Sequence, residues 1–282
     1  MIHQNTPEWL EMRKNHIGAS DAPVIMQVSP WKTPMQLWEE KLGLREGFVT
    51  NPAIERGIAL EPIALAEYNA KTGNASAPCV VVHPEIPYLM ASLDGLSRDG
   101  LLAVEIKCPG ALDHATALDG NIPDKYYPQL QHQLAVIGHQ MLHYFSYSSD
   151  GSCLIEVQRD DEYIKDMLDK EAAFWGCVQS FSPPEGTDKD FVIRSDDEWK
   201  QASSEWLSAS ASVRESEALE KECRQRLLAL SSGQSTVGNG VRVQRVVRKG
   251  PVNYTGIPEL GGVDLEKYRK ASCESWRLSL DK

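Results

Sequence analysis

The chain has 282 residues, with 29 Lys and Arg against 40 Asp and Glu, a net charge of −11, and 41% hydrophobic residues. This composition excludes wholesale disorder and collagen-like repeats, and no apolar run approaches the ~20 residues that span a bilayer. The negative charge argues against a protein that coats nucleic acid by bulk positive charge, although it leaves room for a locally basic site.

Helix signals come first along the chain. Thr6 followed by Pro7, and Thr33 followed by Pro34, are each typical of a helix start with the threonine as N-cap. Ser20 precedes another predicted start, and residues 56–69 predict a longer helix. The apolar residues expected on the buried face of that longer helix are Ile58, Ala59, Pro62, Ile63 and Ala66.

Strand signals begin near residue 79, where short apolar runs alternate with turn-rich links. In chain order the predicted elements are strands at 79–83, 89–94 and 101–107, a helix at 126–137, strands at 144–148 and 153–158, and an amphipathic helix at 161–181. This order predicts an α+β fold with a mixed central sheet flanked by helices.

After about residue 195 the pattern changes, so we expect a catalytic domain over 1–195 and a helix-and-hairpin extension over 196–282. The extension is predicted to hold a long helix at 199–230, a hairpin at 233–249 and a final strand at 275–280. Residues 241–250 carry four cations and no acid, which are Arg242, Arg245, Arg248 and Lys249. This basic hairpin could contact DNA, bind a protein partner, pack in a subunit interface or simply face solvent.

The six cysteines are scattered with no C-x-x-C pair, and the amino terminus lacks the apolar core and cleavage site of a secretory signal. We therefore expect reduced cysteines, a cytoplasmic location, and neither a cysteine-ligated iron–sulfur cluster nor a structural zinc. His139 and His143 lack the Glu of an H-E-x-x-H motif, so ordinary packing is expected of them.

The segment ASLDGLSRDGLLAVEIKCPG carries the strongest chemical signal. It places Asp94 at the end of one predicted strand, with Glu105 and Lys107 on the next. Because side chains alternate along a strand, Glu105 and Lys107 project to one side while Val104 and Ile106 face the core. Two carboxylates and a lysine are then expected to converge across the hairpin.

Two close carboxylates repel each other unless a cation lies between them, and Mg²⁺ prefers such oxygen ligands. Glu61 in the segment GIALEP is a candidate for a further carboxylate ligand, and the backbone carbonyl of Ile106 for another oxygen. Lys107 could orient a water or offset charge on a phosphorane. Taken alone, however, an Asp followed by E-x-K also fits a surface strand with solvated charges.

Four segments of the sequence favour the metal site over a surface strand with solvated charges. IGASDAPVIMQVSPWKTPMQLWEEKLGL, ERGIALEP, SLDG…VEIKCP and YYPQLQHQL occur in this order between residues 5 and 195. Together they resemble the YqaJ-type viral recombinases, relatives of lambda exonuclease in the PD-(D/E)XK nuclease superfamily with its restriction-endonuclease-like core. Leu93 stands where the proline of the superfamily motif would be, which is a common variation.

The resemblance implies a role for each matching residue. Asp94 and Glu105 would bind catalytic Mg²⁺ with Glu61 and the Ile106 carbonyl, and Lys107 would be the catalytic lysine. Two metal ions are implied, with Mn²⁺ able to substitute. The residues implied in binding the terminal 5′-phosphate and the DNA are Arg13, Ser20, Ser92, Gln129, the wedge Ile54, the aromatic Trp9 and, as a backbone contact, Lys32.

Simpler interpretations of these residues stay open. Arg13 could pair with Glu8 or Glu11 along its own helix, and Ser20 could be only an N-cap. Gln129 could be a plain polar helix residue, and Ile54 could belong to the core.

The resemblance implies a Mg²⁺-dependent 5′→3′ exonuclease that degrades linear double-stranded DNA to 5′-mononucleotides. It would leave a 3′ overhang for single-strand-annealing recombination of bacteriophage DNA inside a bacterial host. A homotrimeric ring and a single-strand annealing protein as partner are implied as well. The alternatives are another PD-(D/E)XK endonuclease and a non-catalytic DNA- or recombinase-binding module.

Overall fold

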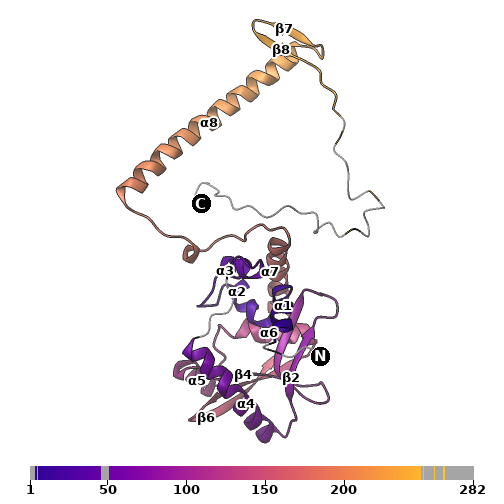
Figure 1. Ribbon diagram of the computed structural model, residues 1–282, viewed down its shortest axis with the longest axis vertical. Coiled ribbons are helices and arrows are strands. Elements are labelled where there is room, and N and C mark those ends of the chain that lie inside the picture. The colour runs from indigo at the N-terminus through magenta and orange to yellow at the C-terminus, as the bar shows by residue number, and fades with distance from the viewer. Residues whose placement is uncertain are drawn as a thin grey trace. The chain divides into compact units, whose positions relative to one another are not determined.

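The computed structural model describes residues 4, 6–45, 51–248, 250, 257 and 263, so the strand predicted at 275–280 lies outside the described residues. The chain divides into two units, residues 1–193 and 194–282, each of which is described by itself (Figure 1). No helix within the described ranges is long and apolar enough to cross a membrane.

The helices of the first unit begin where their caps predict. Thr6 Oγ1 accepts a hydrogen bond from the Trp9 N–H at 3.2 Å, and Thr33 Oγ1 accepts one from the Gln36 N–H at 3.2 Å. The helices before the sheet are α1 (Pro7–Lys14), the 3₁₀ turn η1 (Ala19–Asp21), α2 (Ala22–Ile25), α3 (Pro34–Lys41) and α4 (Pro52–Thr72). Those after its first strands are α5 (Ala111–Leu118), which the sequence did not predict, α6 (Tyr127–Ile137), α7 (Asp161–Gln179) and the turn η2 (Asp188–Asp190).

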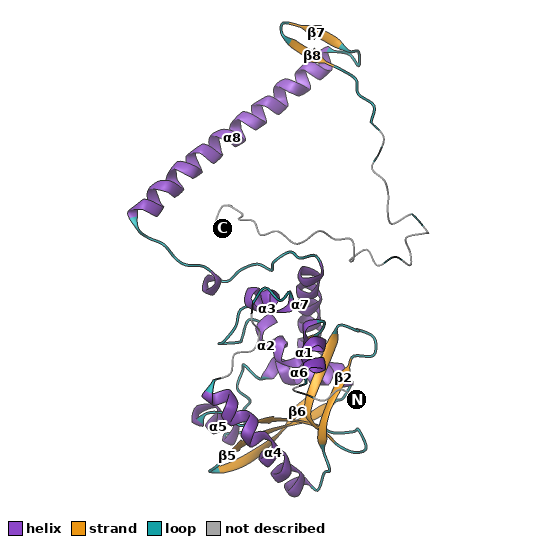
Figure 2. Cartoon of the chain, viewed as in Figure 1, coloured by secondary structure: helices purple, strands orange, loops and turns teal. Residues whose placement is uncertain are grey.

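The central sheet is mixed, as predicted (Figure 2). Its strands are β1 (Ile17–Gly18), β2 (Ala77–Val82), β3 (Leu89–Leu96), β4 (Ala103–Lys107), β5 (Met141–Ser148) and β6 (Gly151–Gln158). Strand β1 runs parallel to β3 and β4 runs parallel to β5, whereas the β2–β3, β3–β4 and β5–β6 pairs are antiparallel.

Strand β3 has a partly open edge that positions the site. β2 pairs with β3 from Met90 to Leu96, so it occupies one edge along most of the strand. A strand has only two edges, and therefore β1 and β4 must share the other one. β1 pairs only with Leu89 and Met90, and β4 only with Gly95 and Leu96. The backbone between these pairs, up to Asp94, is left for side-chain partners.

Apolar residues pack on both faces of the sheet. The larger core includes Leu93 of β3, Leu130 and Leu134 of α6 and Met167 of α7, all fully buried. A smaller core forms where α4 covers the other face. Its members are Ala64, Tyr68, Val104, Ile106 and Phe145, so Val104 and Ile106 do face a core.

The buried face predicted for the helix at 56–69 was wrong. All five predicted residues are exposed; Ile58 and Ile63, for example, have exposed fractions of 49% and 53%. The inward stripe instead contains Ala64 and Tyr68, and Glu61 lies one turn before Ala64 on the same stripe. The apolar pattern misled because this helix covers a part of the sheet that contains carboxylates.

The second unit is a long helix followed by a hairpin. α8 (Asp197–Leu230) begins at the cap Asp196, whose carboxylate accepts the Trp199 N–H, and none of its residues is buried. β7 (Thr236–Gly238) and β8 (Val241–Val243) pair antiparallel. Asn239 and Gly240 have φ angles of 46° and 80°, which suit the two-residue turn between right-twisted strands.

Candidate active site

Glu105 is the buried centre of the candidate site, with an exposed fraction of only 2%. Its Oε1 pairs with the Lys107 ammonium and also accepts a hydrogen bond from the Gln129 side-chain amide. Its Oε2 accepts a hydrogen bond from the Gln133 side-chain amide. A solvated surface strand, the simpler interpretation of the E-x-K pattern, therefore does not describe Glu105.

Asp94 lies beside Glu105 because β3 and β4 part at this point. The paired residues end at Gly95 and Val104, which are the neighbours of Asp94 and Glu105 in the two strands. The Asp94 carboxylate accepts a hydrogen bond from the Ile106 N–H at 2.7 Å. The side chain thus takes the place of a backbone acceptor and fixes the end of the hairpin.

Glu61 of α4 adds a third carboxylate to this environment. Burial raises the pKa of Asp94 well above its ordinary value, and the negative charges of Glu105 and Glu61 raise it further. Burial also raises the pKa of Glu61, and the charge of Glu105 adds to this effect. Burial would lower the pKa of Lys107, but the charges of Glu105 and Asp94 outweigh it and raise that pKa. The site therefore holds three carboxyl groups against one lysine, and its environment disfavours the ionised forms of Asp94 and Glu61.

This donor set fits a hard divalent cation. Its side chains supply three carboxylates, oxygen ligands of the type that Mg²⁺ prefers, and the Ile106 carbonyl stays the predicted further oxygen. A bound cation would favour the ionised forms of Asp94 and Glu61, which burial and mutual repulsion disfavour. As they stand, the described residues contain no group of three or more His, Cys, Asp or Glu arranged to hold a metal. Glu105 is instead bonded to Lys107, Gln129 and Gln133.

Gln133 was missed in the sequence. The i, i+4 spacing of Gln129 and Gln133 in QLQHQ puts both amides on one helix face, and that spacing could have revealed the pair. Between them, His132 ties α6 to its neighbours and is fully buried. Its Nδ1 lies 2.7 Å from Glu171 Oε1 of α7, and its Nε2 lies 3.0 Å from the Met90 carbonyl of β3. These bonds hold both glutamines against Glu105.

A second polar cluster joins the predicted phosphate-binding residues. The Trp9 indole N–H donates to Ser92 Oγ at 2.9 Å, and the Arg13 guanidinium donates to Ser20 Oγ at 2.9 Å. The guanidinium also lies over the Trp9 ring, 4.9 Å from its centre. Ser92 is two residues before Asp94, so both project from the same face of β3. The structure therefore places this cluster and the carboxylates along one strand.

A buried ion pair that the sequence did not reveal contacts Arg13 and fixes its position. The Lys41 ammonium lies 2.6 Å from Asp21 Oδ2, and both side chains are almost fully buried. The ammonium also donates to the carbonyls of Arg13 and His16, at 2.7 and 2.6 Å. Asp21 Oδ1 in turn lies 3.5 Å from the Arg13 guanidinium. No local pattern links Asp21 to Lys41, because they are 20 residues apart.

The remaining predicted residues have other partners. Gln129 contacts Glu105 rather than the cluster around Arg13. Lys32 pairs with Glu40 of α3. Ile54 is half-buried in the first turn of α4, and its N–H donates to Asn51 Oδ1 at 3.0 Å. His143 accepts or donates a 2.8 Å hydrogen bond with the Tyr68 hydroxyl, in keeping with ordinary packing.

The fold is that of PD-(D/E)XK-type exonuclease structures. One such structure is the alkaline exonuclease LHK-Exo from Laribacter hongkongensis, with a TM-score of 0.55 and 29% identity over 62% of this chain and 94% of the exonuclease. The same enzyme in complex with dAMP gives a TM-score of 0.56 with the same identity and coverage.

Residues 8–140 match the YqaJ-like viral recombinase domain, so the predicted resemblance is confirmed. YqaJ of Bacillus subtilis, an uncharacterized protein, is 32% identical over 174 residues, which are 60% of this chain and 54% of YqaJ. The uncharacterized protein R354 of Acanthamoeba polyphaga mimivirus is 29% identical over 152 residues, which are 48% of this chain and 27% of R354. The chain thus spans about half the length of the first relative and about a quarter of the second.

Proposed function

We propose that this protein is a metal-dependent DNA nuclease that degrades linear duplexes from their 5′ ends. The observation that carries the proposal is the alignment of two clusters along β3. Asp94 with Glu105 and Lys107 would cut the phosphodiester, and Arg13 with Ser92 would hold the terminal phosphate. The likeness to an alkaline exonuclease supports a nuclease role.

In this mechanism the chain's own residues set the register. The planar Arg13 guanidinium suits a dianionic 5′-phosphate, and the Ser20 and Ser92 hydroxyls can donate to its remaining oxygens. With the end held there, the next phosphodiester lies toward Asp94 and Lys107. The Lys107 ammonium, kept protonated by its raised pKa, offsets negative charge that develops on the attacked phosphate.

The carboxylates and their amide partners complete the site. Asp94, Glu105 and Glu61, with the Ile106 carbonyl, would hold Mg²⁺, and Mn²⁺ could substitute. When bound, the metal would supply positive charge to the phosphate and an activated water. Gln129 and Gln133 would keep the Glu105 carboxylate in one orientation while the metal binds.

The finer parts of the proposal rest on the family resemblance. They are release of 5′-mononucleotides, a 3′ overhang for single-strand annealing, a homotrimeric ring and an annealing protein as partner. Ile54 as a wedge and Lys32 as a backbone contact belong to the same group. So do two metal ions and action inside a bacterial host cell.

The competing functions are a PD-(D/E)XK endonuclease and a non-catalytic DNA-binding module. They are separated by incubating the full chain and Mg²⁺ with three substrates: linear duplexes with 5′-phosphate ends, the same duplexes with 5′-hydroxyl ends, and closed circles. We expect rapid loss of the phosphorylated linear duplex alone. Cleavage of circles would favour an endonuclease, and inactivity on all three would favour the non-catalytic module.

Arg13→Ala is expected to reduce the preference for 5′-phosphate over 5′-hydroxyl ends by roughly 10- to 100-fold, since a charge-assisted contact contributes ~1.5–3 kcal/mol. The measurement is the ratio of initial rates on the two linear duplexes. Lys14→Ala is the matched control, because Lys14 is a cation on the same helix that pairs with Glu11 at 3.7 Å. An unchanged ratio in Arg13→Ala would place the 5′-phosphate elsewhere.

A further inference from the structure

Helix α8 carries a seven-residue repeat along its 34 residues. Trp199, Trp206, Val213 and Leu227 are spaced by seven or fourteen residues, and Glu220 occupies the remaining position of the series. Three residues further on from each lie mostly small side chains: Ala202, Ala209, Ser216, Cys223 and Leu230. These two series form the a and d positions of a coiled-coil seam.

The seam is open in this structure. Trp199, Val213 and Leu227 have exposed fractions of 49%, 56% and 41%, and no residue of α8 is buried. A helix that exposes a heptad seam gains stability when a second helix covers it.

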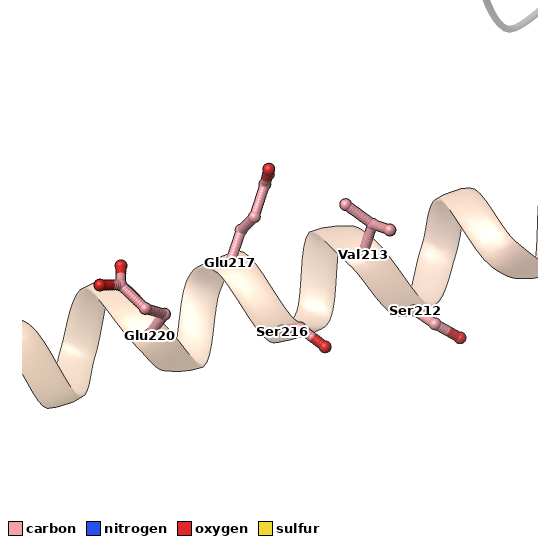
Figure 3. Close-up of a pocket in the computed structure, with 5 residues that line it drawn as sticks. All are labelled: Ser212, Val213, Ser216, Glu217 and Glu220. Carbon is pink, nitrogen blue, oxygen red and sulfur yellow. The ribbon is translucent and has the colours of Figure 1, made fainter.

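The middle of the seam offers only a shallow surface depression. It is lined by five residues of α8, which are Ser212, Val213, Ser216, Glu217 and Glu220 (Figure 3). Four of them, at 213, 216, 217 and 220, follow the i, i+3, i+4, i+7 spacing of the hole that receives a knob in a coiled coil. Ser216 is small, so the hole suits one branched apolar side chain.

We propose that the occupant is α8 of a second copy of this chain, packed antiparallel. In that arrangement each copy places Val213 into the hole of the other. The same register sets large a residues opposite small d residues. Trp206 then lies opposite Cys223, and Leu227 lies opposite Ala202, so these two layers are complementary in volume. At the remaining positions Trp199 lies opposite Leu230 and Glu220 opposite Ala209.

Charge favours the antiparallel direction over the parallel one. In the antiparallel register Glu205 flanks the seam next to Arg226 of the second copy, and two-fold symmetry creates this pair twice. In a parallel pair Glu220 would meet Glu220 at the same level of the seam, which is repulsive. The parallel register also offers no flanking pair of opposite charge.

The contact does not depend on the proposed nuclease function. A two-fold contact through α8 doubles the mass of whatever assembly the rest of the chain forms, whether that is a monomer or a ring. A failure of DNA cleavage would therefore contradict the proposed nuclease function but not the α8 contact. A failure of α8 to associate would contradict the α8 contact but not the nuclease function.

The first test measures the solution mass of the full chain over a range of concentrations. Glu205→Arg and Arg226→Glu each create like-charge contacts, and each is expected to raise the dissociation constant of the doubling step about tenfold. The double variant E205R/R226E restores the pairing and the wild-type constant. Glu215→Arg with Lys221→Glu is the matched control, because both lie outside the seam, and it is expected to match the wild type.

The second test fixes the direction. Trp206→Cys is expected to form an oxidative cross-link between two chains through Cys223, and adding Cys223→Ser abolishes it. Within one helix these positions are about 25 Å apart, so neither an internal bond nor a parallel pair explains the cross-link. A wild-type chain that never doubles, or no rescue in the double variant, or no cross-link through Cys223, would each overturn the proposal.

Discussion

Lys107→Ala is expected to lower the rate of DNA cleavage by about 10³-fold, the size of effect seen when one preorganised donor to a developing charge is removed. DNA binding is expected to survive. The reason is geometric, because Gln129 and Gln133 continue to hold the Glu105 carboxylate when the ammonium is gone. Single-turnover cleavage of a linear 5′-phosphorylated duplex measures the rate, and a binding titration in Ca²⁺ measures the affinity.

The control for Lys107→Ala is Lys170→Ala, which removes an exposed lysine that pairs with Asp166 of the same helix at 2.8 Å. We expect it to cleave at the wild-type rate. The negative charges of Glu105 and Asp94 raise the pKa of Lys107, which favours its protonated form beside these carboxylates. Cleavage at the normal rate by Lys107→Ala would show that the catalytic site has been assigned wrongly.

The parts of the site that sequence reasoning placed well share one property, which is that they depend on local geometry. Alternation along β4 put Glu105 and Lys107 on one side, and an antiparallel hairpin brought Asp94 next to them. The caps Thr6 and Thr33 are also local, since each acts on an N–H three residues away. Such patterns can be recognised in a single chain because they need no knowledge of tertiary packing.

The parts that were missed depend on contacts between distant elements. Asp21 contacts Lys41 only because α3 packs near η1. Gln133 donates to Glu105 only because α6 packs against the sheet. The inward face of α4 was mistaken because its stripe begins with Glu61 and its exposed side carries Ile58 and Ile63. A hydrophobic pattern cannot predict a helix face that is shared between a small core and a carboxylate site.

The negative net charge also has a more specific meaning once the site is described. Glu61, Asp94 and Glu105 account for three of the acids, and their charge would be offset by a bound divalent cation. The cations that face DNA in the proposal, Arg13 and Lys107, are few and are each held by specific partners. Local arrangement rather than bulk charge would therefore bind the substrate.

Lys41→Met is expected to lower the free energy of unfolding by about 3–5 kcal/mol, the cost of leaving one member of a buried ion pair without its partner. Asp21 would remain buried, with Arg13 at 3.5 Å as its nearest cation. The double variant Asp21→Asn with Lys41→Met removes both charges and is expected to lose less than Lys41→Met alone. Urea unfolding measures both, and Lys170→Met at an exposed pair is the control, expected within about 0.5 kcal/mol of the wild type.

The same ion pair predicts that the free energy of unfolding falls at acid pH, a part of the pH profile called the acid limb. Burial would raise the pKa of Asp21, but Lys41 and Arg13 outweigh it and lower that pKa from 3.8 to about 2. A carboxyl whose pKa falls on folding adds stability above its unfolded pKa and loses it as the pH drops toward its folded pKa. Asp21 thus contributes about 2 kcal/mol above pH 4, which is lost between pH 4 and pH 2. Asp21→Asn is expected to be less stable at neutral pH and to lack this part of the acid limb. If its acid limb matched that of the wild type, Asp21 would not be the carboxylate that Lys41 stabilises, and the support proposed for Arg13 would be wrong.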